Sequence, residues 1–71
     1  MTLVGQTILR APDGVRWVVQ TLRTGEGYTT TARKTGCDLT PAGTRADASA
    51  EEAERTHARL CAAIKERGAL P

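Results

Sequence analysis

The stretch VRWVVQTLRT, residues 15–24, decides the fold of this chain. β-Branched and aromatic residues are frequent in it, and it contains no Gly or Pro, which is the pattern of a β-strand. The flanking segments APDG and GEG are turn sequences, because Pro12 presets φ and Gly14 can adopt a positive φ. We therefore expect Val15–Thr24 to be the middle strand of an antiparallel meander.

Two further strands are expected on either side of this segment. Thr2–Arg10, with the sequence TLVGQTILR, is β-branched and aliphatic, and Tyr28–Thr35 is a polar, Thr-rich strand. Gly36–Ala48 has no clean period and is rich in Gly, Pro and Thr, so a loop is expected there, with a short extended piece near Cys37–Thr40.

The second half of the chain predicts one helix from about Ala50 to Arg67. Ser49 and Glu52 have the spacing of a capping box, and Gly68 is a C-terminal stop. Ala53, His57, Leu60, Cys61 and Ile64 form its apolar stripe. The predicted fold is α+β, β-β-β-α, a three-stranded antiparallel sheet packed on one C-terminal helix. It is a single domain, with the meander in 1–35, the loop in 36–48, the helix in 49–68 and a tail in 69–71.

The composition fits a small soluble domain. The chain has 71 residues, 39% of them hydrophobic, no Phe and a net charge of +2. It contains no apolar run long enough for a membrane span and no signal-peptide pattern, so a cytoplasmic location is expected, with Cys37 and Cys61 as free thiols. Arg outnumbers Lys eight to two and Asn is missing, which is typical of a GC-rich genome, such as that of an actinobacterium or its phage.

Strand alternation predicts more apolar surface than one helix can cover. Val15, Trp17 and Val19 share one face of the middle strand, and Val18 and Leu22 share the other. In the first strand Leu3 and Leu9 oppose Val4 and Ile8. An uncovered apolar patch usually marks an interaction site, so a homodimer or a protein partner is expected to bind Val4, Ile8, Val18 and Leu22. The alternative is that Gly36–Ala48 folds back over this face.

The chain's chemically reactive side chains give little support for a metal site or an enzyme. Cys37, His57 and Cys61 are three candidate zinc ligands, with Asp38 as a fourth, but the usual paired-cysteine knuckle is missing. The other interpretation is that His57 and Cys61 pack in the helix stripe. A Cys–His pair needs a pocket, and a chain of this size is too small to build a deep cleft. We therefore expect no enzyme, cofactor, metal or small-molecule substrate.

Positive charge is concentrated in the predicted sheet. Residues 1–36 contain five basic and two acidic residues, whereas residues 37–71 contain five basic and six acidic residues. A short antiparallel sheet can lie in the DNA major groove, where Arg and Gln read bases or bind phosphates. The candidate nucleic-acid-binding residues are Arg10, Arg16, Gln20, Arg23, Arg33 and Lys34. The alternative is that these residues form an ordinary solvated face.

The segment GQTILRAPDGVRWVV, residues 5–19, resembles the opening of the arm-type DNA-binding domain of tyrosine-recombinase integrases. The family pattern is matched here by Gly5, Arg10, Asp13, Gly14, Trp17 and Val19, then more loosely by ARKTG and by the helix opening SAEEAE. The aromatic residue that precedes the helix in that family has no counterpart here. The resemblance implies a β-β-β-α domain from a phage or mobile element that lays its sheet in the major groove.

A second resemblance implies a protein partner. The segments GEGY, TGC and DASAEEA are similar to the amino-terminal domain of HicB-type antitoxins, whose sheet and helix bind a toxin. The leading expectation is thus a non-enzymatic DNA-binding protein that uses a basic sheet face. The alternative is a protein–protein interaction module, antitoxin-like or inhibitory, that acts through an exposed apolar sheet face.

Overall fold

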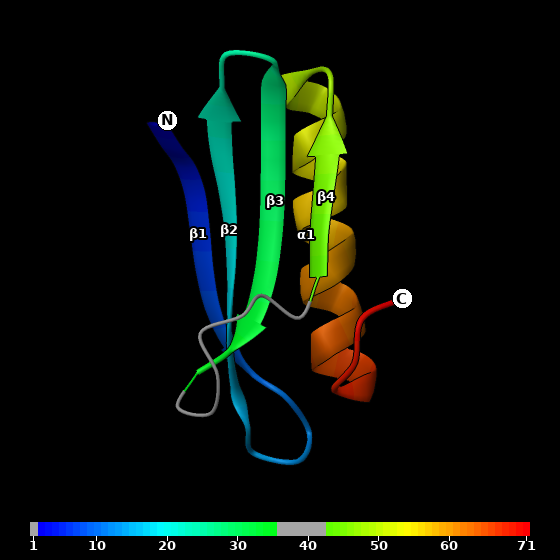
Figure 1. Ribbon diagram of the computed structural model, residues 1–71. Helices are drawn as coiled ribbons and strands as arrows, with labels where there is room; N and C mark the ends of the chain where they lie inside the picture. The colour runs from blue at the N-terminus through cyan, green and yellow to red at the C-terminus, as the bar shows by residue number, and fades with distance from the viewer. Residues whose placement is uncertain (1, 36–42) are drawn as a thin grey trace.

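A computed structural model describes residues 2–35 and 43–71, which form a twisted antiparallel sheet with one helix across a face (Figure 1). The sheet has four strands in the spatial order β1-β2-β3-β4. The elements are β1 (Thr2–Arg10), β2 (Arg16–Thr24), β3 (Gly27–Lys34), β4 (Gly43–Asp47) and α1 (Ala50–Arg67). The predicted α+β class, the antiparallel meander and the C-terminal helix are confirmed, but the prediction of three strands is wrong.

The additional strand is β4, which lies within the predicted loop. Its sequence, GTRAD, has no hydrophobic alternation, and its three central residues are exposed. The strand forms because β3 offers a free backbone edge, on which Tyr28 pairs with Asp47 and Ala32 with Gly43. Residues 43–47 therefore extend the sheet and do not fold back over it. The extended piece expected near Cys37–Thr40 falls in residues 36–42, outside the described residues.

Both predicted tight turns are present, and two glycines make them possible. At the β1–β2 turn Gly14 has a φ of 88° and donates its amide to the Ala11 carbonyl at 2.9 Å. At the β2–β3 turn Gly27 has a φ of 146°, and a Cβ there would lie 2.6 Å from the carbonyl oxygen of Asp47. Gly27 thus allows close approach of the β4 end to this turn.

The helix begins and ends where the sequence predicts. The Ser49 hydroxyl accepts a hydrogen bond from the Glu52 amide at 3.2 Å and donates one to the Glu52 carboxylate at 3.1 Å. In the usual capping box this carboxylate accepts from the backbone amide of the first residue, whereas here it accepts from the Ser49 hydroxyl. Gly68 closes the helix in the left-handed region and donates its amide to the Ile64 carbonyl at 2.9 Å. Within residues 2–35 and 43–71, no helix combines the length and the hydropathy that a membrane span requires.

The core lies between α1 and one face of the sheet. Trp17 and Val19 of β2 and Ala32 of β3 pack there against Leu60 and Ile64 of the helix. All five are at most 3% exposed. The face of β2 that carries Trp17 therefore meets the helix, which leaves the opposite face, called the open face below, without a covering layer among the described residues.

Candidate functional site

The open face consists of side chains arranged in rows across the strands. Residues directly opposite each other in an antiparallel pair point to the same side of a sheet, so the register defines each row. One row pairs Arg10 with Arg16. The next rows are Ile8–Val18–Arg33, then Gln6–Gln20–Thr31–Thr44, and then Leu3–Leu22–Thr29–Ala46. None of these residues is acidic.

Three of the predicted basic residues, together with Gln20, are brought together on the open face. Arg10 and Arg16 are exposed cross-strand partners, and Arg33 is half-buried one row away. Among the described residues no carboxylate lies within 4.0 Å of these three guanidinium groups. The salt bridge in the described part of the chain joins Arg55 to Glu51 on α1. The cluster is therefore an unneutralised positive patch beside a polar row.

The polar row contains a defined side-chain contact. Gln20 Nε2 donates to Gln6 Oε1 at 2.8 Å, which links the centre of β2 to the edge strand β1. This bond leaves the carbonyl oxygen of Gln20 and the amino group of Gln6 available as an acceptor and a donor. The row can thus offer both kinds of hydrogen-bonding group to a ligand.

Arg23 and Lys34 do not belong to this cluster. Arg23 pairs with Tyr28, and Lys34 pairs with Trp17. Alternation along the strands therefore places both residues on the same side of the sheet as the helix. Lys34 Nζ lies 5.5 Å from the centre of the Trp17 ring. The structure therefore separates the six predicted nucleic-acid-binding residues into an open-face group of four and two others.

The predicted apolar interface is also divided. Ile8 is 58% exposed on the open face beside the half-buried Val18, and Leu22 is half-buried two rows away. A bulge between Leu3 and Gly5 shifts the register. Leu3, 51% exposed, therefore joins Leu22 on the open face, where the sequence placed it on the opposite side.

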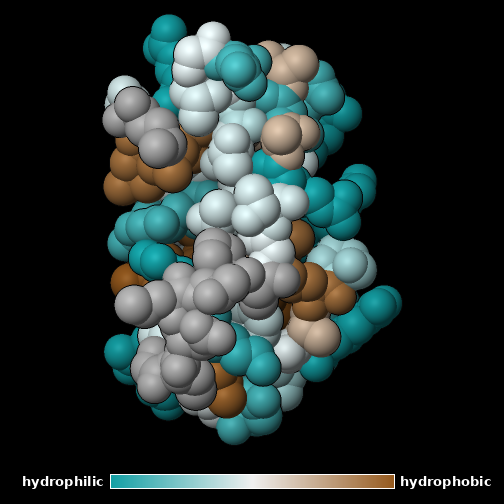
Figure 2. Space-filling view, in the orientation of Figure 1, coloured by the Kyte–Doolittle hydropathy of each residue, from teal (hydrophilic) through white to brown (hydrophobic). Residues whose placement is uncertain are grey.

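Val4 is the residue displaced by this bulge. It is 55% exposed and lines a cleft between β1 and α1 instead of extending the open-face rows. In Figure 2, aliphatic surface over the β1 and β2 side is interrupted by polar surface. The apolar groups thus form small separate patches.

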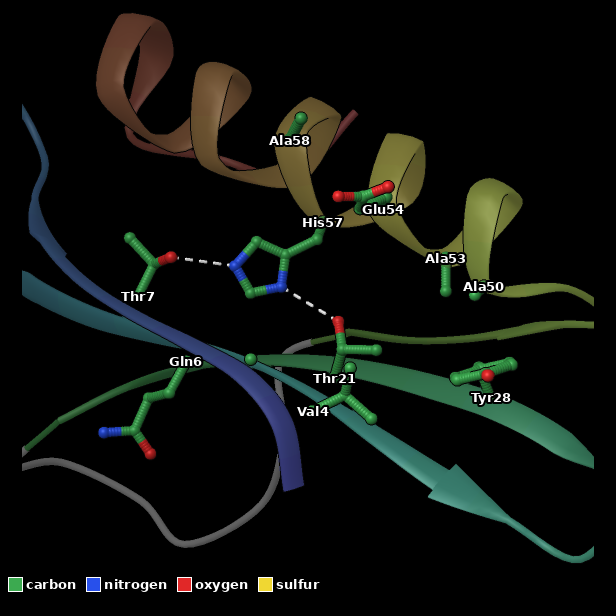
Figure 3. Close-up of a pocket in the computed structure, with 11 residues that line it drawn as sticks. Val4, Gln6, Thr7, Thr21, Tyr28, Ala50, Ala53, Glu54, His57 and Ala58 are labelled. Atoms are coloured by element: carbon green, nitrogen blue, oxygen red, sulfur yellow. Dashed lines mark hydrogen bonds between the residues drawn. The ribbon is translucent and has the colours of Figure 1, made fainter. Parts of the chain in front are cut away.

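His57 joins the helix to the sheet beside this cleft (Figure 3). Its Nε2 lies 2.8 Å from the Thr7 hydroxyl of β1, and its Nδ1 lies 2.9 Å from the Thr21 hydroxyl of β2. Thr21 in turn hydrogen-bonds with Thr30 of β3 at 3.0 Å. The imidazole therefore ties α1 to β1, β2 and β3, and both ring nitrogens are occupied by hydroxyl groups.

The cleft beside His57 has a volume of about 510 Å³ and is open to solvent. Burial lowers the pKa of His57 below its ordinary value of 6.5, which favours the neutral ring. Burial raises the pKa of the Cys61 thiol above its ordinary value of 9.0, against the opposing effects of a hydrogen bond with Thr7 and the charge of Lys65. Both ring nitrogens of His57 are engaged by threonine hydroxyls, and among the described residues no hydrogen bond joins His57 to Cys61.

The candidate zinc ligands are only partly described. Cys61 is a free thiol. No cluster of three or more His, Cys, Asp or Glu side chains suited to a metal ion occurs in the part of the chain that the structure describes. Cys37 and Asp38 lie outside the described residues. The hydrogen bonds of His57 give it a structural role at the helix–sheet contact.

Sequence reasoning missed one feature of the open face that alternation could have revealed. One face of β2 carries Arg16, Val18, Gln20 and Leu22, whereas Arg23 lies on the other face. Alternation within this single strand therefore indicates that Arg23 is separate from Arg16 and Gln20. The Thr7–His57 contact had no comparable signal, because the partners are 50 residues apart.

Comparison with protein-family models, with curated proteins and with solved structures gives no match to this chain.

Proposed function

We propose that this protein binds DNA through the open face of its sheet. The observation that carries the proposal is the clustering of Arg10, Arg16 and Arg33 with Gln20 on a face whose described strand residues include no carboxylate. Proteins bind DNA mainly by neutralising phosphates with Arg and Lys, and an acidic side chain on the contact face opposes this. The overall charge of +2 gives a much weaker argument than this local asymmetry.

The pairing of Arg10 with Arg16 strengthens the case for an anionic ligand. Like charges directly opposite each other in adjacent strands are destabilising. No described carboxylate neutralises either residue. A phosphate placed between the two guanidinium groups removes this repulsion and gains charge-assisted hydrogen bonds.

The remaining open-face side chains suit contact with bases in the major groove. Arg can bind guanine, Gln can bind adenine, and Thr offers both a hydroxyl and a methyl group. Gln20 occupies the centre of β2, with Thr31 opposite it on β3. The arginines therefore supply phosphate contacts at one end of the sheet, and the Gln and Thr row supplies base contacts beside them.

The test is a binding titration with a mixed-sequence duplex at several salt concentrations. Phosphate contacts release counterions, so affinity should fall steeply with salt. The triple variant Arg10→Ala, Arg16→Ala, Arg33→Ala should bind at least about tenfold more weakly and lower the salt slope by about 3. The charge-matched control is Arg23→Ala, Arg55→Ala, Arg59→Ala, which leaves the open face intact. Absence of binding at low salt, or an equal loss in both variants, would refute the proposal.

A protein partner on the same face is the second candidate. Ile8 is 58% exposed and Leu3 is 51% exposed, each beside a half-buried aliphatic residue of β2. Burying such side chains contributes roughly 1.5–3 kcal/mol each. Replacing Val18 or Leu22 with Glu should abolish binding of a protein partner to this face. Light scattering of each variant mixed with a partner that co-purifies with the wild-type protein measures this binding. Unchanged association in both variants excludes this candidate.

A further inference from the structure

The outer edge of β1 is an unusually open pairing surface. β1 has nine residues and pairs only with β2 among the described strands. An edge strand directs alternate backbone N–H and C=O groups outward, where another strand can bind them. β1 contains no Pro and no charged residue before Arg10, and Leu3, Val4 and Ile8 are all more than half exposed.

The opposite edge of the sheet is much less suited to pairing. β4 has five residues, and its centre carries the exposed Arg45. Short edge strands and charged side chains are two means by which proteins block edge-to-edge association. On β1 the corresponding protection is limited to the bulge between Leu3 and Gly5. The two edges therefore differ in the way expected if β1 has a partner.

We infer that β1 pairs antiparallel with β1 of a second copy of this chain, so that two sheets form one continuous sheet. The choice of a second copy rests on the distribution of charge along the strands. The ends of β1 and β3 and the start of β2 lie at one end of the molecule with the last turn of α1 (Figure 1). Basic residues gather there, namely Arg10, Arg16, Arg33, Lys34, Lys65 and Arg67, against Asp13 and Glu66.

The other end of the molecule is acidic. It contains the β2–β3 turn, the end of β4 and the start of α1, with Glu26, Asp47, Glu51, Glu52 and Glu54 against Arg23 and Arg55. A two-fold axis between the two β1 strands reverses the direction of the second copy. The basic end of each copy then lies beside the acidic end of the other. Parallel pairing would instead place like ends together. Charge complementarity thus favours the antiparallel arrangement.

The side chains of β1 fit the same arrangement. Strand reversal brings the exposed Leu3 of one copy close to the exposed Ile8 of the other, and both side chains lie on the open face. Their contact removes apolar surface from water at both ends of the paired region. With the two-fold axis normal to the sheet, the two open faces point to the same side. The inference does not rest on DNA binding, because it concerns the strand edge and not the open face.

The test combines molecular mass with intermolecular contacts. Sedimentation equilibrium of the whole chain should show a dimer. NMR of a mixture of isotope-labelled and unlabelled protein should show contacts between β1 backbone protons of different copies. A monomer at millimolar concentration overturns the inference and leaves the edge for a different polypeptide. Intermolecular contacts confined to the methyl groups of Val18 and Leu22 overturn it as well, because they indicate face-to-face packing.

A matched pair of variants tests which edge is used. Val4→Lys adds a charge at the β1 edge and should weaken dimerisation at least tenfold. Ala46→Lys adds the same charge at an exposed position of β4, on the opposite edge, and should change the dimerisation constant less than twofold. Equal weakening by the two variants contradicts pairing through β1. If Val4→Lys does not fold, the contacts in the wild-type mixture still decide the question. Loss of dimerisation with retained DNA binding would separate this inference from the proposed function.

Discussion

The Nδ1 atom of His57 lies 2.9 Å from the hydroxyl of Thr21, which itself lies 3.0 Å from the hydroxyl of Thr30. This contact joins the helix to the two central strands through polar side chains at the edge of an otherwise apolar core. Buried hydroxyl groups need such partners, because an unsatisfied buried polar group costs about 1–3 kcal/mol. The single histidine therefore serves to fix the helix on the sheet.

Replacing His57 with Ala should destabilise the fold by about 1–3 kcal/mol, because the Thr7 and Thr21 hydroxyls each lose their hydrogen bond with the imidazole. Urea denaturation measures this change. Arg59→Ala, on the exposed side of the same helix, should stay within about 0.5 kcal/mol of wild type. A double-mutant cycle of His57→Ala with Thr21→Val should show coupling of at least about 0.5 kcal/mol, and strict additivity would contradict the network.

Stability should fall as the pH decreases below 6.5. The pKa of His57 is lowered in the folded state, so in this range the unfolded chain binds more protons than the folded chain. The histidine contribution is complete above pH 6.5 and is lost as the pH falls towards the folded pKa. Because the chain has one histidine, His57→Gln should remove this part of the pH dependence. The same slope in both proteins would show that carboxylates cause it.

Stability should also fall as the pH rises above 9.0. The pKa of the Cys61 thiol is raised in the folded state, so the unfolded chain loses a proton that the folded chain retains. Cys61→Ala should flatten this alkaline limb in thermal melts recorded from pH 7 to 10. Persistence of the whole limb in the variant would contradict this assignment.

Gly27→Ala should destabilise the protein by about 1–3 kcal/mol, because residue 27 has a φ of 146° and its new Cβ would lie 2.6 Å from the Asp47 carbonyl oxygen. Gly25→Ala is the matched control in the same turn, since a Cβ there meets no atom within 4 Å. Chemical denaturation of the two variants should therefore separate them. Equal stabilities would mean that the β4 end does not approach this turn.

Ile64→Ala should cost about 2–5 kcal/mol, since Ile64 is completely buried against β2 and β3. Ile8→Ala makes the same chemical change at a side chain that is 58% exposed, and it should cost much less. Calorimetry of both variants measures the difference. Comparable losses would indicate that the open face is covered by a tightly packed partner under the conditions used.

The helix and the first three strands were predictable because their signals are local. Ser49 and Gly68 specify the ends of α1 in the sequence itself, and the Asp13–Gly14 turn separates two strands of clear β propensity. β4 was not predictable in this way, because its strand state depends on hydrogen bonds to β3 and not on its own composition. Edge strands of mixed, exposed residues carry little periodic signal.

The candidate site was predictable in composition but not in arrangement. The sequence identified Arg10, Arg16, Gln20 and Arg33, and period-two alternation separates Arg23 from the other β2 residues. The pairing of Arg10 with Arg16, however, required the register between strands. The bulge that moves Leu3 to the open face leaves no pattern in the sequence apart from the neighbouring Gly5. The arrangement of the site therefore depends on the register between strands, which local sequence patterns do not reveal.

The most direct test of the account is an NMR titration of the whole protein with duplex DNA at low salt. We expect shifts in the Arg10, Arg16 and Arg33 side-chain NεH signals and in the methyl groups of Ile8 and Val18, all on the open face. The methyl group of Ala62, exposed on the outer side of α1, should not move. Shifts confined to the helix, or no shifts at saturating DNA, would contradict binding through the open face.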